Sequence, residues 1–212
     1  WEENKDGLSA FLRQHPEVAM ALDETDESSL NGADLACKSS LLQERGLMRE
    51  AAELFQMAWR KCYPEEYIRE FEGQLDFIAG ELQNCSGPIV DIASGRGMLV
   101  ERLLKSTTAP VTATDLSESV LLDHLGCRFP DQVRSGRLNL TPCDAKNMPF
   151  PDGSIPALTT CLGLQNIPGP ERAAGELRRV CGGRLYALCM FFPDGDAENQ
   201  GAVKSLGLEG AY

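Results

Sequence analysis

The sequence predicts an α/β fold in which parallel strands alternate with helices, carried by the second half of the chain. Between residues 88 and 192, short apolar runs recur, turn-forming residues bound them, and amphipathic helical segments separate them. Strands that alternate with helices are typical of a parallel sheet with helices on both faces. The first 84 residues lack such runs and have helical periodicity instead.

Five strands are expected, at residues 89–93, 111–114, 138–140, 157–161 and 184–190. The helices between them are expected to begin near Leu99, after Ser117 and at Pro170. Ser117 has the side chain of a helix N-cap, and proline suits the first position of a helix. Asp115 closes the second strand. The order of elements is therefore strand, helix, strand throughout this half.

The N-terminal half predicts two longer helices. Apolar residues recur at steps of three and four in residues 47–59 and again in residues 68–82, and Pro64 separates the two stretches. A shorter helix is expected around Phe11, and the acidic segment 23–34 is expected to be a loop. A breaker cluster at residues 84–88 marks the boundary. We therefore expect a helical region over residues 1–84 and an α/β domain over residues 85–212.

Composition excludes several classes of function. The 212 residues have a net charge of -12 without a Lys/Arg cluster, which disfavours nucleic acid as a partner. No apolar run reaches the ~20 residues of a membrane span. The acidic start is unlike a signal peptide, and a chain that begins at Trp1 is expected to be a fragment.

The cysteines predict neither a metal site nor a disulfide framework. None forms a C-x-x-C pair, and the two histidines, His15 and His124, have no metal-ligand spacing. We interpret the eight cysteines as reduced, mostly buried thiols of a cytoplasmic protein. They are Cys37, Cys62, Cys85, Cys127, Cys143, Cys161, Cys181 and Cys189.

The most informative segment follows the first expected strand. Residues 91–97, Asp-Ile-Ala-Ser-Gly-Arg-Gly, end a strand, make a turn of small residues and begin a helix. Gly95 and Gly97 let the backbone approach a ligand, because no Cβ intervenes. Unpaired N–H groups at the helix start favour a carboxylate or phosphate. A dinucleotide-binding turn would need a third small residue where Val100 stands, which weakens that alternative.

Acidic residues at the ends of three strands suit an adenosyl ligand. Asp91 can accept hydrogen bonds from a ligand ammonium or orient the turn through a water. Asp115 is placed to accept from two ribose hydroxyls, since one carboxylate has acceptor sites for both. Leu116 can pack on an adenine face, and Asp144, followed by Ala145, can accept from the adenine amino group.

In this order, the segments resemble the motifs of class I S-adenosylmethionine-dependent methyltransferases (type 11). The resemblance is strongest to the small-molecule branch of the ubiquinone and menaquinone biosynthesis enzymes. Residues 91–97 resemble the first motif, with Ala93 where glycine is common, and residues 115–117 resemble the second. Residues 144–152, 161–167 and 176–185 resemble the adenine-side segment, the fourth-strand segment and the helix with a Gly-Gly turn. The match covers about half of the chain.

The resemblance implies a Rossmann-like, doubly wound sheet of strand order 3-2-1-4-5 and S-adenosylmethionine as cofactor. It implies methyl transfer to a small molecule by in-line displacement, with the acceptor atom open among O, N, C, S and As. No catalytic acid or base is assigned, because a sulfonium is an activated leaving group and positioning suffices. The expected cofactor-binding residues are Asp91, Ala93, Ser94, Gly95, Gly97, Asp115, Leu116, Asp144, Ala145, Cys161 and Leu162.

The resemblance also implies a role for the helical region, since the N-terminal helices of similar enzymes fold over the cofactor. Tyr63 and Tyr67 are then candidate substrate contacts, and helix packing is the alternative. Gln165 is either a substrate contact or a surface residue. Two other functions stay open: a non-catalytic S-adenosylmethionine-binding or partner-dependent interaction protein, and a nucleotide-dependent oxidoreductase.

Two departures from the family pattern concern the end of the sheet. Val180-Cys181 runs directly into Gly182, so the turn before the fifth strand is expected to be short or to lack residues. The family sheet ends with a helix and an antiparallel hairpin, but only residues 193–212 follow here. We therefore expect the C-terminal hairpin to be missing, either because the chain is truncated or because the N-terminal helices cover the exposed edge of the sheet.

Overall fold

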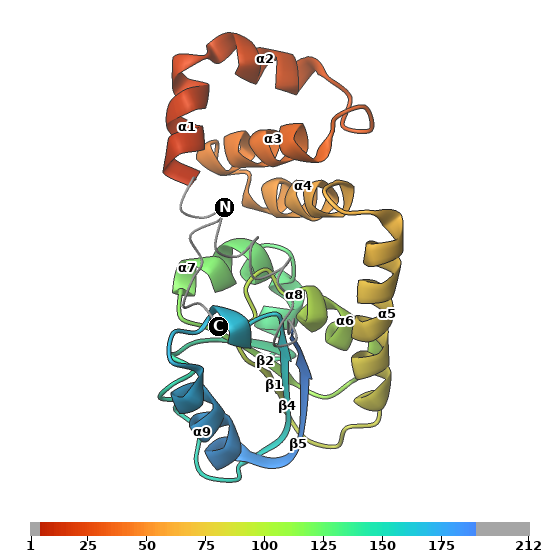
Figure 1. Cartoon of the computed structure of the whole chain (residues 1–212), viewed down its shortest axis with the longest axis vertical. Helices are drawn as coiled ribbons and strands as arrows, with labels where there is room; N and C mark the ends of the chain where they lie inside the picture. Colours follow the sequence, from red (N-terminus) through yellow and green to blue (C-terminus); the bar gives the residue numbers. More distant parts are fainter. Residues whose placement is uncertain (1–4, 190–212) are drawn as a thin grey trace, which may run out of the picture. The chain divides into compact units, whose positions relative to one another are not determined.

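A computed structural model describes residues 5–189 and contains the expected sheet (Figure 1). Five strands pair in the order β3-β2-β1-β4-β5, and every neighbouring pair is parallel. This order confirms the predicted Rossmann-like arrangement. The strands are β1 Ile89–Asp91, β2 Val111–Asp115, β3 Leu138–Pro142, β4 Ile155–Cys161 and β5 Cys181–Leu188.

Helices account for most of the remaining described chain. The N-terminal ones are α1 Lys5–Gln14, α2 Pro16–Glu24, α3 Gly32–Glu44, α4 Met48–Lys61 and α5 Glu65–Glu81. Those between the strands are α6 Met98–Ser106, α7 Glu118–Val120, the π-helical turn η2 Leu121–Gly126, α8 Pro130–Arg134, the 3-10 turn η3 Leu164–Asn166 and α9 Pro170–Val180. The predicted N-cap of α7 is present, since Ser117 Oγ accepts from Val120 N at 3.3 Å.

Helices cover both faces of the sheet because alternate strand residues point to opposite sides. On one face, Val90 and Leu158 share a buried core with Leu177 of α9. On the other face, Tyr186 of β5 donates a hydrogen bond to Glu81 of α5 at 3.3 Å. Figure 1 shows α9 on one side of the sheet and α6 with α5 on the other. The sheet is therefore doubly wound.

The described chain forms two compact units. One contains the helices up to Gly73 together with Asp123–Arg128, and the other contains Gln74–Leu122 and continues from Phe129. The first unit has its own buried apolar core, formed by Leu12, Leu22, Leu30, Leu35, Ala36, Leu41, Leu54 and Ala58. The division of roles at residue 84 stays a prediction.

The prediction of a loop over residues 23–34 is wrong at both of its boundaries. Helix α2 includes its first residues, α3 begins at Gly32, and the connection between them is short. The Asn31 side chain caps α3 by accepting from Asp34 N at 2.9 Å. Helix α3 also buries polar residues. Ser39 is 2% exposed and donates to Ala51 O at 2.7 Å, so no clear apolar stripe marks the helix in the sequence.

The fifth strand begins earlier than expected. Helix α9 ends at Val180 and β5 begins at Cys181, so no residue separates them. The Gly-Gly pair, expected as a turn before the strand, lies inside it. The expected end at Met190 and the C-terminal hairpin lie outside the described residues. Among helices within residues 5–189, none is long and apolar enough to cross a membrane.

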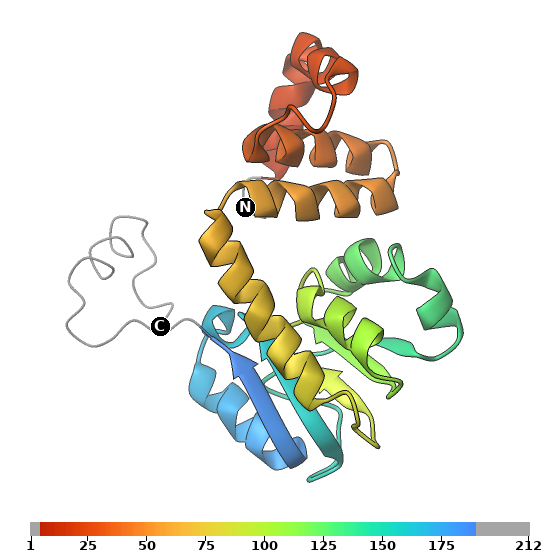
Figure 2. The ribbon, with the colours of Figure 1, turned by 90° about the vertical axis from the view of Figure 1, so that its right-hand side faces the viewer.

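A bulge explains why two glycines follow Cys181. Strands β4 and β5 run side by side (Figure 2), but Ile155 pairs with Cys181 while Ala157 pairs with Arg184. Two residues of β5 therefore lie opposite one residue of β4, Pro156, which is the pattern of a β-bulge. A Cβ at Gly182 would overlap the carbonyl oxygen of Gly153, and one at Gly183 would overlap that of Pro156. Only glycine lets the backbones approach this closely.

We expect Gly183→Ala to lower the free energy of unfolding by about 1–3 kcal/mol, because backbone atoms of Pro156 cannot yield to the added Cβ. Urea denaturation measures the change. Gly175→Ala is the matched control, since Gly175 lies within α9 and nothing lies within 4 Å of its Cβ position. There alanine should stabilise the helix by about 0.5–1 kcal/mol. Equal effects of the two substitutions would contradict this explanation.

Candidate cofactor site

The candidate site lies at the carboxyl ends of the strands, at the point where the order of the strands along the sheet reverses. Strand β1 pairs with β2 on one side and with β4 on the other. The chain order therefore reverses between β1 and β4, and ligands of open α/β sheets bind at such a switch point. Asp91 ends β1, and the turn between β1 and α6 contains four more of the predicted residues, Ala93, Ser94, Gly95 and Gly97.

Left-handed backbone conformations shape this turn. Ala93, Gly95 and Gly97 have φ angles of 52°, 50° and 74°. Glycine adopts such angles without strain, whereas an alanine there is uncommon. Gly163 makes room for Ala93, because a Cβ on Gly163 would lie 2.6 Å from the Cβ of Ala93. The Gly97 carbonyl then accepts the first helical bond of α6, from Glu101 N at 2.9 Å.

Ser94 ties the turn to the neighbouring strand. Its hydroxyl donates to the carbonyl oxygen of Asp91 at 3.0 Å and accepts from the backbone N–H of Thr114 at 3.2 Å. Its own N–H donates to the carbonyl oxygen of Thr114 at 2.8 Å. The serine therefore supports the turn, because it bridges the ends of β1 and β2.

The Asp91 carboxyl is buried beneath the turn. It is 1% exposed, and its Oδ1 accepts a 2.6 Å hydrogen bond from Thr159 Oγ1 on β4. Burial raises the pKa of Asp91 to about 6; the nearby Asp115 charge acts in the same direction, while hydroxyls of Thr159 and Ser94 oppose it. A buried carboxyl whose pKa is raised toward neutrality, next to the glycine-containing turn between β1 and α6, is a candidate functional residue.

Asp115 links the end of β2 to the same turn. Its Oδ2 accepts from Gly95 N at 2.9 Å, and its Oδ1 accepts from Ser117 N at 3.1 Å. Each carboxylate oxygen keeps a second acceptor site, since an ionised carboxylate has about four. The next residue, Leu116, is 77% exposed although it is large and apolar. An acceptor next to an exposed apolar side chain suits a ribose and an aromatic base.

Asp144 lies in a turn after β3. Its Oδ1 accepts from Lys146 N at 2.9 Å, and its carbonyl oxygen accepts from Asn147 N at 2.9 Å. The carboxylate is half exposed, so it remains accessible. Ala145 packs on the core cluster that contains Ile92. The structure thus brings the β1, β2 and β3 candidates to one edge of the sheet.

On the other side of β1, Cys161 ends β4 and Leu162 follows it. Leu162 has a left-handed φ of 56°, and its N–H donates to Leu188 O at 2.7 Å. The Cys161 pKa is raised to about 12, mainly by burial, with smaller effects of Asp91 and Cys189. The thiol therefore stays protonated and is no nucleophile at neutral pH. Gln165, in η3, is partly buried.

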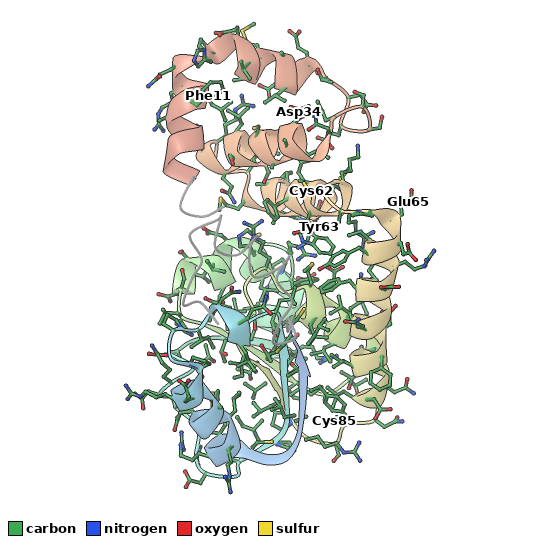
Figure 3. All side chains as sticks on the ribbon, in the orientation of Figure 1. Phe11, Asp34, Cys62, Tyr63, Glu65 and Cys85 are labelled. Carbon is green, nitrogen blue, oxygen red and sulfur yellow. The ribbon has the colours of Figure 1, made fainter. Side chains whose placement is uncertain are left out.

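The two tyrosine candidates belong to the other compact unit. Tyr63 lies in the turn between α4 and α5 and is 45% exposed (Figure 3). It stacks on Tyr67 with ring centroids 4.9 Å apart, and Trp59 and Phe71 complete a four-ring cluster. The cluster joins α4 to α5, which confirms helix packing as one role of these rings.

The sequence analysis missed the threonines that surround Asp91. Thr159 bonds its carboxylate, and Thr114 Oγ1 donates to its carbonyl oxygen at 3.0 Å. Both threonines are at most 1% exposed. A signal was present in the sequence, because Thr159 and Thr160 interrupt an otherwise apolar strand. The pairing of Thr159 with Asp91 depends on strand register, which the sequence does not display.

Comparisons with known proteins agree with this geometry. Residues 90–187 match the family described as "Methyltransferase domain". Ubiquinone/menaquinone biosynthesis C-methyltransferases UbiE of Burkholderia mallei and Burkholderia thailandensis are each 36% identical over 115 residues. That alignment covers 48% of this chain and 42% of each relative, so the chain spans less than half of the length of these relatives.

Two solved structures share the fold. The YcgJ protein of Bacillus subtilis has a TM-score of 0.53 and 16% identity, covering 65% of this chain and 58% of its own. A candidate methyltransferase of Bacillus halodurans has a TM-score of 0.52 and 22% identity, covering 61% and 56%. These findings agree with the resemblance noted in the sequence: residues 90–187 match a methyltransferase domain, and the fold is shared with both solved structures.

Proposed function

We propose that this chain binds S-adenosylmethionine and transfers its methyl group to a small-molecule acceptor by in-line displacement. One observation carries the proposal: the Asp115 carboxylate is bonded to Gly95 N, which joins the turn after β1 to the end of β2. The family match and the relatives named as C-methyltransferases support the reaction. The net charge of -12 supports a small molecule over a nucleic acid.

The described residues fit this cofactor. The Cβ position of Gly95 faces open space, so a ligand can approach the turn. Asp115 has spare acceptor sites for ribose hydroxyls, and the exposed Leu116 offers an apolar surface to the adenine. We propose that the turn and Asp91 hold the methionine end, that Asp144 and Ala145 meet the adenine edge, and that Cys161 and Leu162 line the methyl side.

The chain's own residues then act by binding and orientation. When bound, S-adenosylmethionine supplies a methyl group that its positively charged sulfur already activates. Asp91 and the turn fix one end of the ligand and Asp115 fixes the middle, which restricts the geometry in which an acceptor can react. The raised pKa keeps the Cys161 thiol neutral, so we propose that Cys161 lines the site without taking part in the reaction. We assign no residue as general base.

Isothermal titration calorimetry with S-adenosylmethionine, S-adenosylhomocysteine and NAD tests the binding. We expect both adenosyl ligands to bind and NAD to fail; lack of binding at millimolar concentration contradicts the proposal. Turnover to S-adenosylhomocysteine is then measured with a panel that includes quinol-ring precursors, because the curated relatives are named for ubiquinone and menaquinone biosynthesis. Tight binding without any turnover would favour a non-catalytic binding protein.

We propose further that residues 1–84 recognise the acceptor and that residues 85–212 bind the cofactor. The four-ring cluster supports this division, because a half-exposed Tyr63 offers an aromatic surface to a planar acceptor. The eight cysteines are free thiols, which supports a reducing compartment such as the cytoplasm.

Tyr63→Ala is expected to raise the KM of the acceptor by about tenfold and to leave the Kd of S-adenosylmethionine unchanged, since a buried aromatic contact contributes about 1–1.5 kcal/mol. Steady-state kinetics and calorimetry provide the two values. Phe77→Ala is the control. Phe77 is also aromatic and exposed, but it lies in the unit that begins at Gln74 and contains the sheet, whereas Tyr63 lies in the helical unit. An unchanged KM in Tyr63→Ala would remove this residue from the acceptor site.

A further inference from the structure

We propose that Arg179 and Glu176 of α9 form a clamp that positions the Asp144 turn to recognise the adenine amino group. The inference rests on the proposed cofactor and adds two positioning residues that lie outside the predicted site. Both are on the helix before β5, and the segment they hold follows β3. The clamp therefore connects two parts of the fold that also meet through the apolar core and through the backbone hydrogen bond from Gly153 N to Arg179 O at 2.8 Å.

The Arg179 guanidinium donates hydrogen bonds to the segment of residues 148–152 and to Glu176 on its own helix. A guanidinium has five N–H donors, and each has an acceptor here. Nε donates to Glu176 Oε1 (2.7 Å), Nη1 to Phe150 O and Asp152 Oδ1 (both 2.8 Å), and Nη2 to Met148 O (3.0 Å) and Glu176 Oε2 (2.7 Å). Three of these five acceptors belong to residues 148–152. A lysine, with one ammonium, cannot reproduce this set.

Glu176 completes the grip on Met148. Its Oε2 accepts from Met148 N at 2.8 Å, so both backbone polar groups of Met148 are bound to the clamp. Hydrogen bonds from Arg179 and from Met148 N lower the pKa of Glu176 to about 2. The glutamate is therefore ionised at any pH at which the protein would be studied, and the clamp does not open by titration.

The Met148 backbone lies four residues after the candidate adenine acceptor. Between them, Asn147 N donates to Asp144 O and Lys146 N to Asp144 Oδ1, both at 2.9 Å. The Met148 side chain is 4% exposed and packs in the same core as Ala145. The turn is thus fixed by β3 before it and by the clamp after it, so a displacement of Met148 moves the Asp144 carboxylate.

Anchoring α9 does not require these polar contacts. Ala173, Leu177 and Val180 are each at most 4% exposed and hold the helix on the sheet. The clamp's carboxylate and guanidinium instead bind a segment with no strand or helix of its own. Loss of the clamp should therefore loosen the Asp144 turn while α9 stays in place.

The experiment compares binding of S-adenosylhomocysteine with its inosine counterpart, which has an oxygen in place of the adenine amino group. We expect the wild-type chain to prefer the adenosyl ligand by about tenfold, because a carboxylate pairs with the amino group and repels the oxygen. In Arg179→Gln and Glu176→Gln, affinity for the adenosyl ligand should fall about tenfold and the preference should approach unity. Arg178→Gln, an exposed neighbour on the same helix, should keep both.

The other outcomes of this experiment contradict either the proposed cofactor or the clamp. If the wild-type chain binds neither ligand, the proposed cofactor is wrong. If it binds both equally, Asp144 does not read the amino group and the clamp proposal is overturned. The proposal is also overturned if the variants weaken both ligands by the same factor, since that is a general structural loss. If Arg179→Gln does not fold, Arg179→Lys and Glu176→Gln give the same ratio.

Discussion

Asp115→Ala is expected to weaken S-adenosylmethionine binding by a factor of about 100 or more while the chain stays folded. The carboxylate is proposed to accept from two ribose hydroxyls, and hydrogen bonds to charged groups contribute about 1.5–3 kcal/mol each. The substitution also frees Gly95 N, which donates to Oδ2 at 2.9 Å in the wild-type chain, so the turn after β1 loses one of its ties to β2 while those through Ser94 remain. Both effects weaken ligand binding. Neither removes a buried apolar group, so the chain should stay folded.

Calorimetry measures the affinity, and thermal unfolding shows whether the fold survives. Asp131→Ala is the control with the same change of charge. The Asp131 side chain is 81% exposed on α8, where it pairs with Arg134 one turn away. We expect wild-type affinity in that variant. A similar loss in both variants would mean that net charge, and not the Asp115 contact, governs binding.

The strands could be predicted because short segments rich in apolar residues alternate with helical segments and turns, and their order followed from the resemblance to the methyltransferase family. The prediction failed where packing reverses the usual pattern. Helix α3 buries Ser39 and Lys38, whose polar atoms find partners in neighbouring segments, so hydrophobic periodicity does not reveal it. Gly182 and Gly183 have the composition of a turn but lie in β5, because the bulge opposite Pro156 leaves no room for a side chain.

The candidate site, like the fold, could be predicted from the sequence only in part. Strand ends could be predicted, so Asp91, Asp115 and Asp144 could be assigned to one edge of the sheet from the sequence alone. Contacts between elements distant in sequence could not be predicted. Thr159 is 68 residues from Asp91, and Arg179 is 31 residues from Met148. These residues determine how the acids are held, and only the strand register and the packing of α9 bring them into contact.

Asp91→Asn is expected to raise the free energy of unfolding at pH 8 by up to about 3 kcal/mol and, at the same pH, to weaken S-adenosylmethionine binding. The Asp91 carboxyl is buried, and its pKa rises from the ordinary 3.8 to about 6. Ionising it inside the fold costs free energy, about 1.4 kcal/mol for each unit of the shift. Asparagine avoids that cost and keeps an Oδ1 acceptor for Thr159 Oγ1.

The sign follows from proton binding. Between about pH 4 and pH 6, folded Asp91 still holds its proton while the unfolded chain has lost it, so the folded state binds more protons. Stability of the wild-type chain therefore falls as pH rises through this window and stays lower above it. Asparagine does not titrate. The two chains should be equally stable near pH 4, and the difference should open up to pH 6 and then remain constant.

Urea denaturation at pH 4.5, 6 and 8 measures this difference, and a gap that is independent of pH would contradict the assignment. Ligand binding should change in the opposite direction. A carboxylate that accepts from the ligand ammonium must be ionised, so wild-type affinity should rise through about pH 6, whereas Asp91→Asn should show no such step. A residue that destabilises the fold when charged, and is needed in that form, is expected of a binding site rather than of a structural core.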